Sequence, residues 1–112
     1  MKTINIKLPA WNITELTGYE PVTTFWNDFS IADSFGADAV RDTYRRAFDE
    51  WKDDCAYLTE LVMVLNHKCW LHHDCGDEDM SMLYESLYVE TARYAEDNLK
   101  GDDLSYYLQT TD

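Results

Sequence analysis

The chain has 112 residues, of which 22 are acidic and nine are basic, and its formal net charge is -13 at pH 7. This length suffices for one domain with a single core. Free DNA, RNA and anionic lipid are themselves negatively charged, so the composition disfavours all three as direct partners. An aromatic content of 14% argues against disorder despite the high charge.

Residues 1–21 are predicted to form a short extended segment followed by an ordered loop. Ile4, Ile6 and Leu8 alternate with polar residues before Pro9, as in a strand with one apolar face. A short helix is predicted over residues 23–35. It starts after Pro21 and ends at Gly36, which readily adopts the left-handed conformation that follows many helices.

The middle of the chain, from Asp38 to His73, contains no Gly or Pro. Its apolar side chains recur in steps of three and four, at Val40, Tyr44, Ala47, Trp51, Cys55, Leu58, Val62, Leu65 and Cys69. This is the period of one long amphipathic helix capped by Asp38, about 54 Å long at 1.5 Å per residue. Its second half is apolar on several sides, so we expect other helices or a second copy of the chain to cover it.

A third helix is predicted over residues 77–99, with Asp77 as its cap. In the tail, residues 100–112, a strand that pairs with the N-terminal segment and a final helical turn capped by Asp102 or Asp103 are both open. The predicted fold is all-α: a single domain, residues 1–112, formed by a small helical bundle on one long central helix. A homodimer through the second half of that helix is compatible with this pattern.

Four stretches of the sequence resemble small uncharacterised acidic helical proteins carried by phages and mobile elements of gut bacteria. These stretches are Leu8 to Pro21, Phe29 to Gly36, Tyr57 to Lys68 and Asp97 to Tyr107. The resemblance covers most of the chain and implies a bacterial origin. It assigns no activity and no functional residue.

The strongest asymmetry of the sequence is its charge. Eleven acidic residues and two basic ones follow from Asp74 to Asp112. On the third helix the acids form two neighbouring rows opposite the apolar face: Glu78, Glu85 and Glu96 beside Asp79, Glu90 and Asp97. A solvated face is the simpler interpretation. The sharper hypothesis is a non-catalytic interaction module that docks on a basic protein surface as a DNA mimic does, with Tyr84 and Tyr88 as anchors beside an exposed Val89.

A small helix-turn-helix regulator is the second functional hypothesis. The stretch from Phe29 to Phe48 has Ala32 and Gly36 four residues apart before a helix with Arg41, Arg45 and Arg46. However, this chain has Asp42 where the motif needs an apolar residue, and the net charge opposes DNA binding.

A zinc site is the third hypothesis, with Cys69, His73 and Cys75 as weak candidate ligands. Cys69 and His73 are one helical turn apart, but the spacing is not that of a known finger. No catalytic motif is present, so we expect no enzymatic activity and no cofactor. The odd number of cysteines and the lack of an apolar N-terminal leader predict a reduced, cytoplasmic protein.

Overall fold

The computed structural model describes residues 20–111, with side chains from Phe25 onward, and this part of the chain is all-helical. Within it, five helices follow one another: α1 (Glu20–Asp33), α2 (Ala37–Trp51), α3 (Cys55–Asp74), α4 (Glu78–Asn98) and α5 (Gly101–Thr111). The all-α prediction is therefore confirmed for the described residues. The predicted extended segment, residues 1–21, lies outside them apart from Glu20 and Pro21, which belong to α1.

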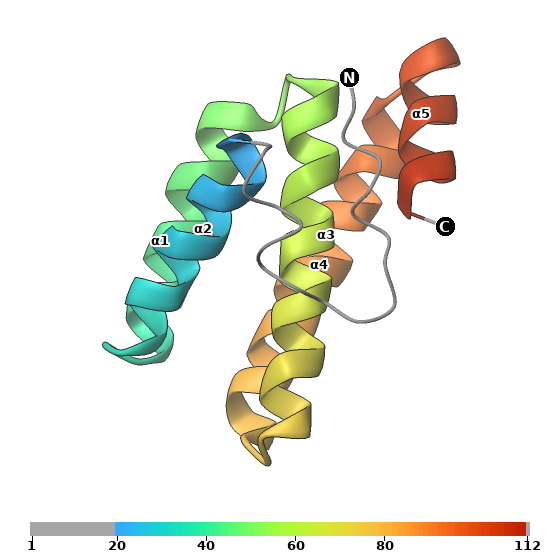
Figure 1. The fold of residues 1–112 in the computed structure, drawn as a ribbon. Helices are drawn as coiled ribbons and strands as arrows, with labels where there is room; N and C mark the ends of the chain where they lie inside the picture. The colour runs from blue at the N-terminus through green and yellow to red at the C-terminus, as the bar shows by residue number, and fades with distance from the viewer. Residues whose placement is uncertain (1–19, 112) are drawn as a thin grey trace.

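Helix α3 is at the centre of the arrangement. It contacts all four other helices, most extensively α4, which runs antiparallel to it (Figure 1). The hairpin formed by α1 and α2 lies on one side of α3, and α5 lies on the other. This position explains why α3 is apolar almost all around, since its neighbours cover it on several sides.

The prediction of one helix from Asp38 to His73 is wrong, because residues 52–54 form a turn between α2 and α3. Asp54 has extended dihedral angles, and its carboxylate accepts a hydrogen bond from the backbone N–H of Tyr57 at 3.0 Å. It is therefore the N-cap of a new helix. The rings of Trp51 and Tyr57 meet across the turn with centroids 4.0 Å apart. The molecule is 38 Å long, shorter than the predicted rod of about 54 Å.

The other predicted boundaries differ less from the structure. The third predicted helix corresponds to α4, and Asp77 caps it by accepting a hydrogen bond from the Met80 amide at 3.2 Å. Asp38 is not the cap of α2. Gly36, with φ at 101°, occupies that position, and Asp38 in the first turn pairs with Arg41 at 3.2 Å. The tail forms the helix α5, so the strand alternative is not observed for residues 101–111.

Two apolar clusters form the core. The larger one joins α1, α2, α3 and α4, where Phe29 and Tyr84 pack edge to face with ring centroids 5.7 Å apart. The smaller one attaches α5 through Leu58, Val62, Ala95 and Tyr107. Residues 58–65 of α3 are all buried within one copy of the chain. The apolar surface predicted for the homodimer is thus covered at these positions, whereas Trp70 and Leu71 near the end of α3 are 58% and 41% exposed. The homodimer stays a prediction.

Candidate functional site

The outward side of α4 carries the six carboxylates that the sequence predicted to share one surface. We call them the acidic face: Glu78, Asp79, Glu85, Glu90, Glu96 and Asp97, all of them exposed. Arg93 is the only Lys or Arg within α4. Glu78 Oε2 lies 2.9 Å from His73 Nδ1. The other five carboxylates form no ion pair with a described residue. Five of these charges are therefore available to a partner.

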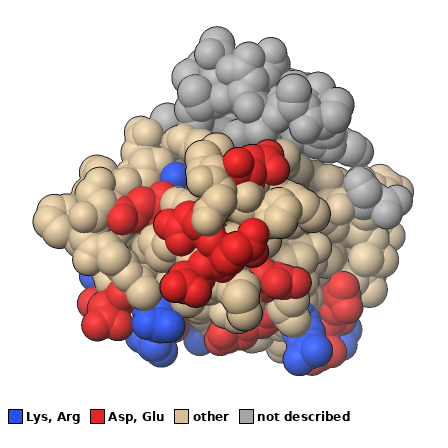
Figure 2. Space-filling model, turned by 90° about the horizontal axis from the view of Figure 1, so that it is seen from below, with Lys and Arg blue, Asp and Glu red and all other residues tan. Residues whose placement is uncertain are grey.

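The end of the molecule at which the α3–α4 turn lies is also acidic. Viewed from that end, Asp and Glu side chains gather over the middle of the surface, and most Lys and Arg side chains lie toward its lower edge (Figure 2). Asp74, Asp77, Glu78 and Asp79 are all exposed there. The acidic face thus continues around the first turn of α4, and a partner approaching from this side meets a negative potential over an extended area.

A shallow depression of about 640 Å³ lies within the acidic face. Its lining consists of Met82, Glu85, Ser86, Val89, Glu90 and Arg93, which all belong to α4. Met82 is 63% exposed, whereas Val89 is half-buried. The two apolar side chains are seven residues apart, close to two helical turns, so they lie on the same side of α4 with carboxylates on both flanks.

The two predicted aromatic anchors do not lie on this surface. Tyr84 is fully buried, and its hydroxyl donates a hydrogen bond to Asp33 Oδ1 at 2.6 Å. Burial, together with this bond and the negative charge of Asp33, strongly raises the pKa of the Tyr84 hydroxyl. Tyr88 is half-buried between the two core clusters. The prediction that Tyr84 is a surface anchor is therefore wrong, and the exposed apolar group of the acidic face is Met82.

A polar cluster that was not predicted from the sequence connects α1, α3 and α4 at Asp33. The Lys68 ammonium group, on a side chain only 3% exposed, lies 3.0 Å from Asp33 Oδ2 and donates a hydrogen bond to Ser30 Oγ at 2.8 Å. It also lies 4.4 Å from the centroid of the Trp26 ring. His72 Nε2 is 3.2 Å from the same oxygen of Asp33, and its ring stacks on that of Tyr84.

The chemistry of this cluster is that of a clamp between helices. Catalysis by a serine and a lysine needs an uncharged amine that accepts the serine proton. Lys68 instead contacts a carboxylate, a hydroxyl and an aromatic face, the usual partners of a charged ammonium group. One signal was available in the sequence. Lys68 falls on the apolar stripe of α3, four residues after Val64 and three after Leu65.

The candidate zinc ligands are not brought together. Cys69 Sγ lies 3.5 Å from Ser81 Oγ, His73 Nδ1 contacts Glu78, and Cys75 is exposed after the end of α3. Within residues 20–111, no group of three or more His, Cys, Asp or Glu side chains is arranged to hold a metal ion. His67, whose pKa burial lowers to about 4, is neutral at pH 7.

The arginines of the helix-turn-helix hypothesis, Arg41, Arg45 and Arg46, are all exposed on α2. Four exposed acidic residues accompany them on the same helix: Asp38, Asp42, Asp49 and Glu50. α2 therefore has no excess of positive charge with which to approach phosphates, and the structure gives the DNA-binding hypothesis no added support.

Comparisons of the chain with family models, curated proteins and solved structures give no significant match. Among residues 20–111, none of the helices combines the length and the apolar character that crossing a membrane requires.

Proposed function

We propose that the protein is a non-catalytic interaction module whose acidic face docks on a basic surface of another protein. The observation that carries this proposal is the depression around Met82 and Val89, which lies among carboxylates that have no partner in the described part of the chain. A face that only keeps a protein soluble does not need an exposed methionine at its centre.

The two kinds of group have separate tasks in such an interface. The carboxylates steer a basic partner toward α4, which raises the association rate and makes it sensitive to salt. Met82 and Val89 lose water when the partner covers them, which slows dissociation. A protein that carries nucleic-acid-binding Lys and Arg residues has the required charge, so an accessory or inhibitor protein that occupies such a surface is the function we favour.

The test compares two double charge reversals that change the net charge equally. Glu85→Lys with Glu90→Lys alters the acidic face, whereas Glu50→Lys with Asp53→Lys, the α2 variant, alters exposed positions at the end of α2 and in the turn that follows it. Each immobilised variant is exposed to bacterial lysate at low and at high salt, and the captured proteins are identified. We expect the wild type and the α2 variant to capture the same basic protein at low salt, and the α4 variant to lose it.

Capture of the same protein by both variants would contradict docking through α4. Loss of capture by both variants would contradict it as well, because it would show that net charge alone decides binding. Once a partner is purified, Met82→Ser with Val89→Ser separates the two contributions. We expect an affinity about tenfold weaker, an association rate close to wild type and a faster dissociation.

A further inference from the structure

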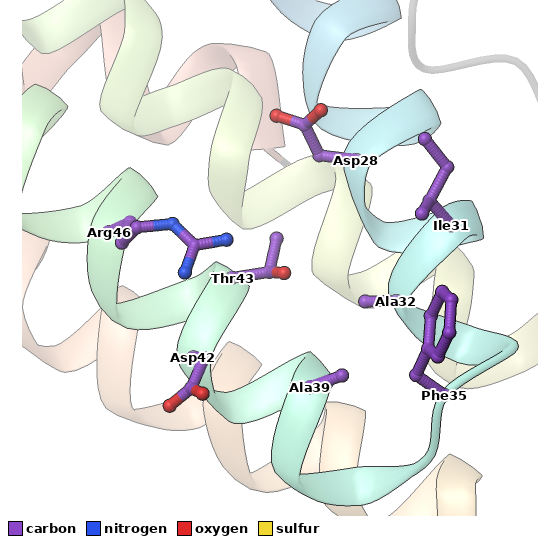
Figure 3. A pocket seen from close by; sticks show the side chains of 8 residues that line it. All are labelled: Asp28, Ile31, Ala32, Phe35, Ala39, Asp42, Thr43 and Arg46. Atoms are coloured by element: carbon purple, nitrogen blue, oxygen red, sulfur yellow. The ribbon is translucent and has the colours of Figure 1, made fainter.

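A second cavity lies between α1 and α2, away from the acidic face. Its volume is about 340 Å³, and its lining consists of Asp28, Ile31, Ala32, Phe35, Ala39, Asp42, Thr43 and Arg46 (Figure 3). One side of the α1–α2 hairpin faces the core through Phe29, Val40 and Tyr44. The cavity occupies the other side, as a groove open to solvent. Its volume falls at the lower end of the range for small-molecule sites, about 300–1,000 Å³.

The groove has an apolar part. Ala32 and Ala39 face each other between the two helices, and their small side chains leave the space open (Figure 3). Ile31 and Phe35 stand beside this floor and are 61% and 77% exposed, respectively. A bulky apolar group placed over the two alanines would remove both side chains from water, which is favourable.

The groove also has a polar part with three charged side chains, two carboxylates (Asp28 and Asp42) and one guanidinium group (Arg46). Asp28 extends from α1 and Arg46 from α2 toward the space between the helices, with Thr43 beside Arg46 (Figure 3). Neither Asp28 nor Arg46 takes part in an ion pair within residues 25–111. A carboxylate and a guanidinium group, each without a salt-bridge partner, therefore flank one end of an apolar groove.

We propose that this groove binds a free α-amino acid with a bulky apolar side chain, such as phenylalanine or leucine. The ammonium group of the ligand pairs with Asp28, its carboxylate accepts hydrogen bonds from Arg46, and its side chain lies over Ala32 and Ala39 against Ile31 and Phe35. An anionic ligand without an ammonium group would leave Asp28 unpaired and face the negative charge of the chain. A cation without a carboxylate would leave Arg46 unpaired. This site is independent of the proposed docking face on α4.

The test is a titration of the ¹⁵N-labelled full chain with L-phenylalanine, followed by amide chemical shifts. We expect saturable shifts in α1 and α2 around the groove. Three probes each remove one recognition element: N-acetyl-phenylalanine lacks the ammonium group, phenylalanine amide lacks the carboxylate, and glycine lacks the side chain. Each should bind at least about fivefold more weakly, the change expected for one partly exposed charge-assisted hydrogen bond or one apolar contact.

Variants place the ligand in the groove. Asp28→Asn and Arg46→Gln should each weaken phenylalanine binding about fivefold. Asp49→Asn and Arg45→Gln, at exposed positions of α2 outside the groove, should leave it unchanged. Ala39→Leu fills the groove and should abolish binding.

Three results would overturn the proposal. One is the absence of saturable shifts in α1 and α2, and another is glycine binding as well as phenylalanine does. The third is tight binding of N-acetyl-phenylalanine amide, in which both charged groups are blocked. Such a site would bind an internal peptide segment instead of a free amino acid.

Discussion

Asp33 and the carboxylates of the acidic face differ in everything that surrounds them. Asp33 is held at the end of α1 by Lys68, His72 and Tyr84, with its side chain only 18% exposed. Glu85 and Glu90 are exposed and have no described partner. A carboxylate that is buried and paired becomes part of the fold, because removing it leaves its partners unsatisfied. A carboxylate that is exposed and unpaired can bind a partner molecule without loss of a contact within the fold. All of these side chains carry the same carboxylate group, so their positions in the fold, and not their chemistry, indicate which of them are structural and which can bind a partner.

The largest effect is expected at Asp33. Asp33→Asn leaves the Lys68 ammonium group buried without its counter-charge, and we expect the free energy of unfolding to fall by about 3 kcal/mol. Denaturation in urea measures this change. Asp38→Asn, which removes an exposed ion pair with Arg41, is the control and should have no measurable effect. Equal stability of the two variants would contradict the clamp.

The next effect concerns pH and His67. Burial lowers the pKa of His67 to about 4 from its usual 6.5, so the unfolded chain binds the proton more readily between these values. Stability from this group is therefore present above pH 6.5 and is lost as the pH falls toward 4, by about 1.5 kcal/mol after allowance for partial exposure. His67→Gln should lose this part of the pH dependence. His73→Gln, on the exposed end of α3, should keep it.

Asp54 is intermediate between Asp33 and the acidic face, because its carboxylate is exposed but accepts a hydrogen bond from the backbone N–H of Tyr57. Asp54→Ala removes the cap of α3, and we expect a loss of about 1 kcal/mol in urea denaturation. The neighbouring Asp53→Ala should change stability less, since no described hydrogen bond uses that side chain. Larger destabilisation by Asp53→Ala would show that the turn is stabilised in another way.

The smallest effect on stability is expected on the acidic face. Glu85→Gln with Glu90→Gln breaks no ion pair with a described residue, and both side chains are exposed, so the unfolding midpoint should not fall. A loss comparable with that of Asp33→Asn would mean that these side chains are structural, and the comparison between the two groups of carboxylates would fail.

The sequence predicted the parts of the structure that depend on local pattern. The short helix before Gly36, the helix after Asp77 and the exposed acidic rows all follow from periodicity and capping. The long helix failed because the interval from Trp51 to Cys55 fits the apolar period whether the chain continues or turns. Only the hydrogen bond from the Tyr57 amide to Asp54 distinguishes a cap from one more solvated acid.

The position of Lys68 on the apolar stripe indicates that it is buried, but its partners and the groove could not be predicted, because both depend on how separate helices pack. Asp33 and Lys68 are 35 residues apart in the chain. Nothing in the sequence indicates that one neutralises the other. Tyr84 shows the same limit. Its place beside the apolar face was recognised, but its contacts with Phe29 and Asp33 of α1, which bury it, depend on the packing of separate helices.

The way α5 is attached indicates that it separates from the other helices before they separate from one another. The smaller cluster around Tyr107 holds α5 against α3 and α4, whereas Asp33 and the larger cluster join the other four helices. Local dissociation of α5 breaks none of the contacts of Asp33 with Lys68, His72 and Tyr84. Amide hydrogens in α5 should therefore exchange with solvent well before those of α3. A fusion partner joined at the C-terminus would then pull on the most weakly anchored helix, while the groove and the acidic rows kept their shape.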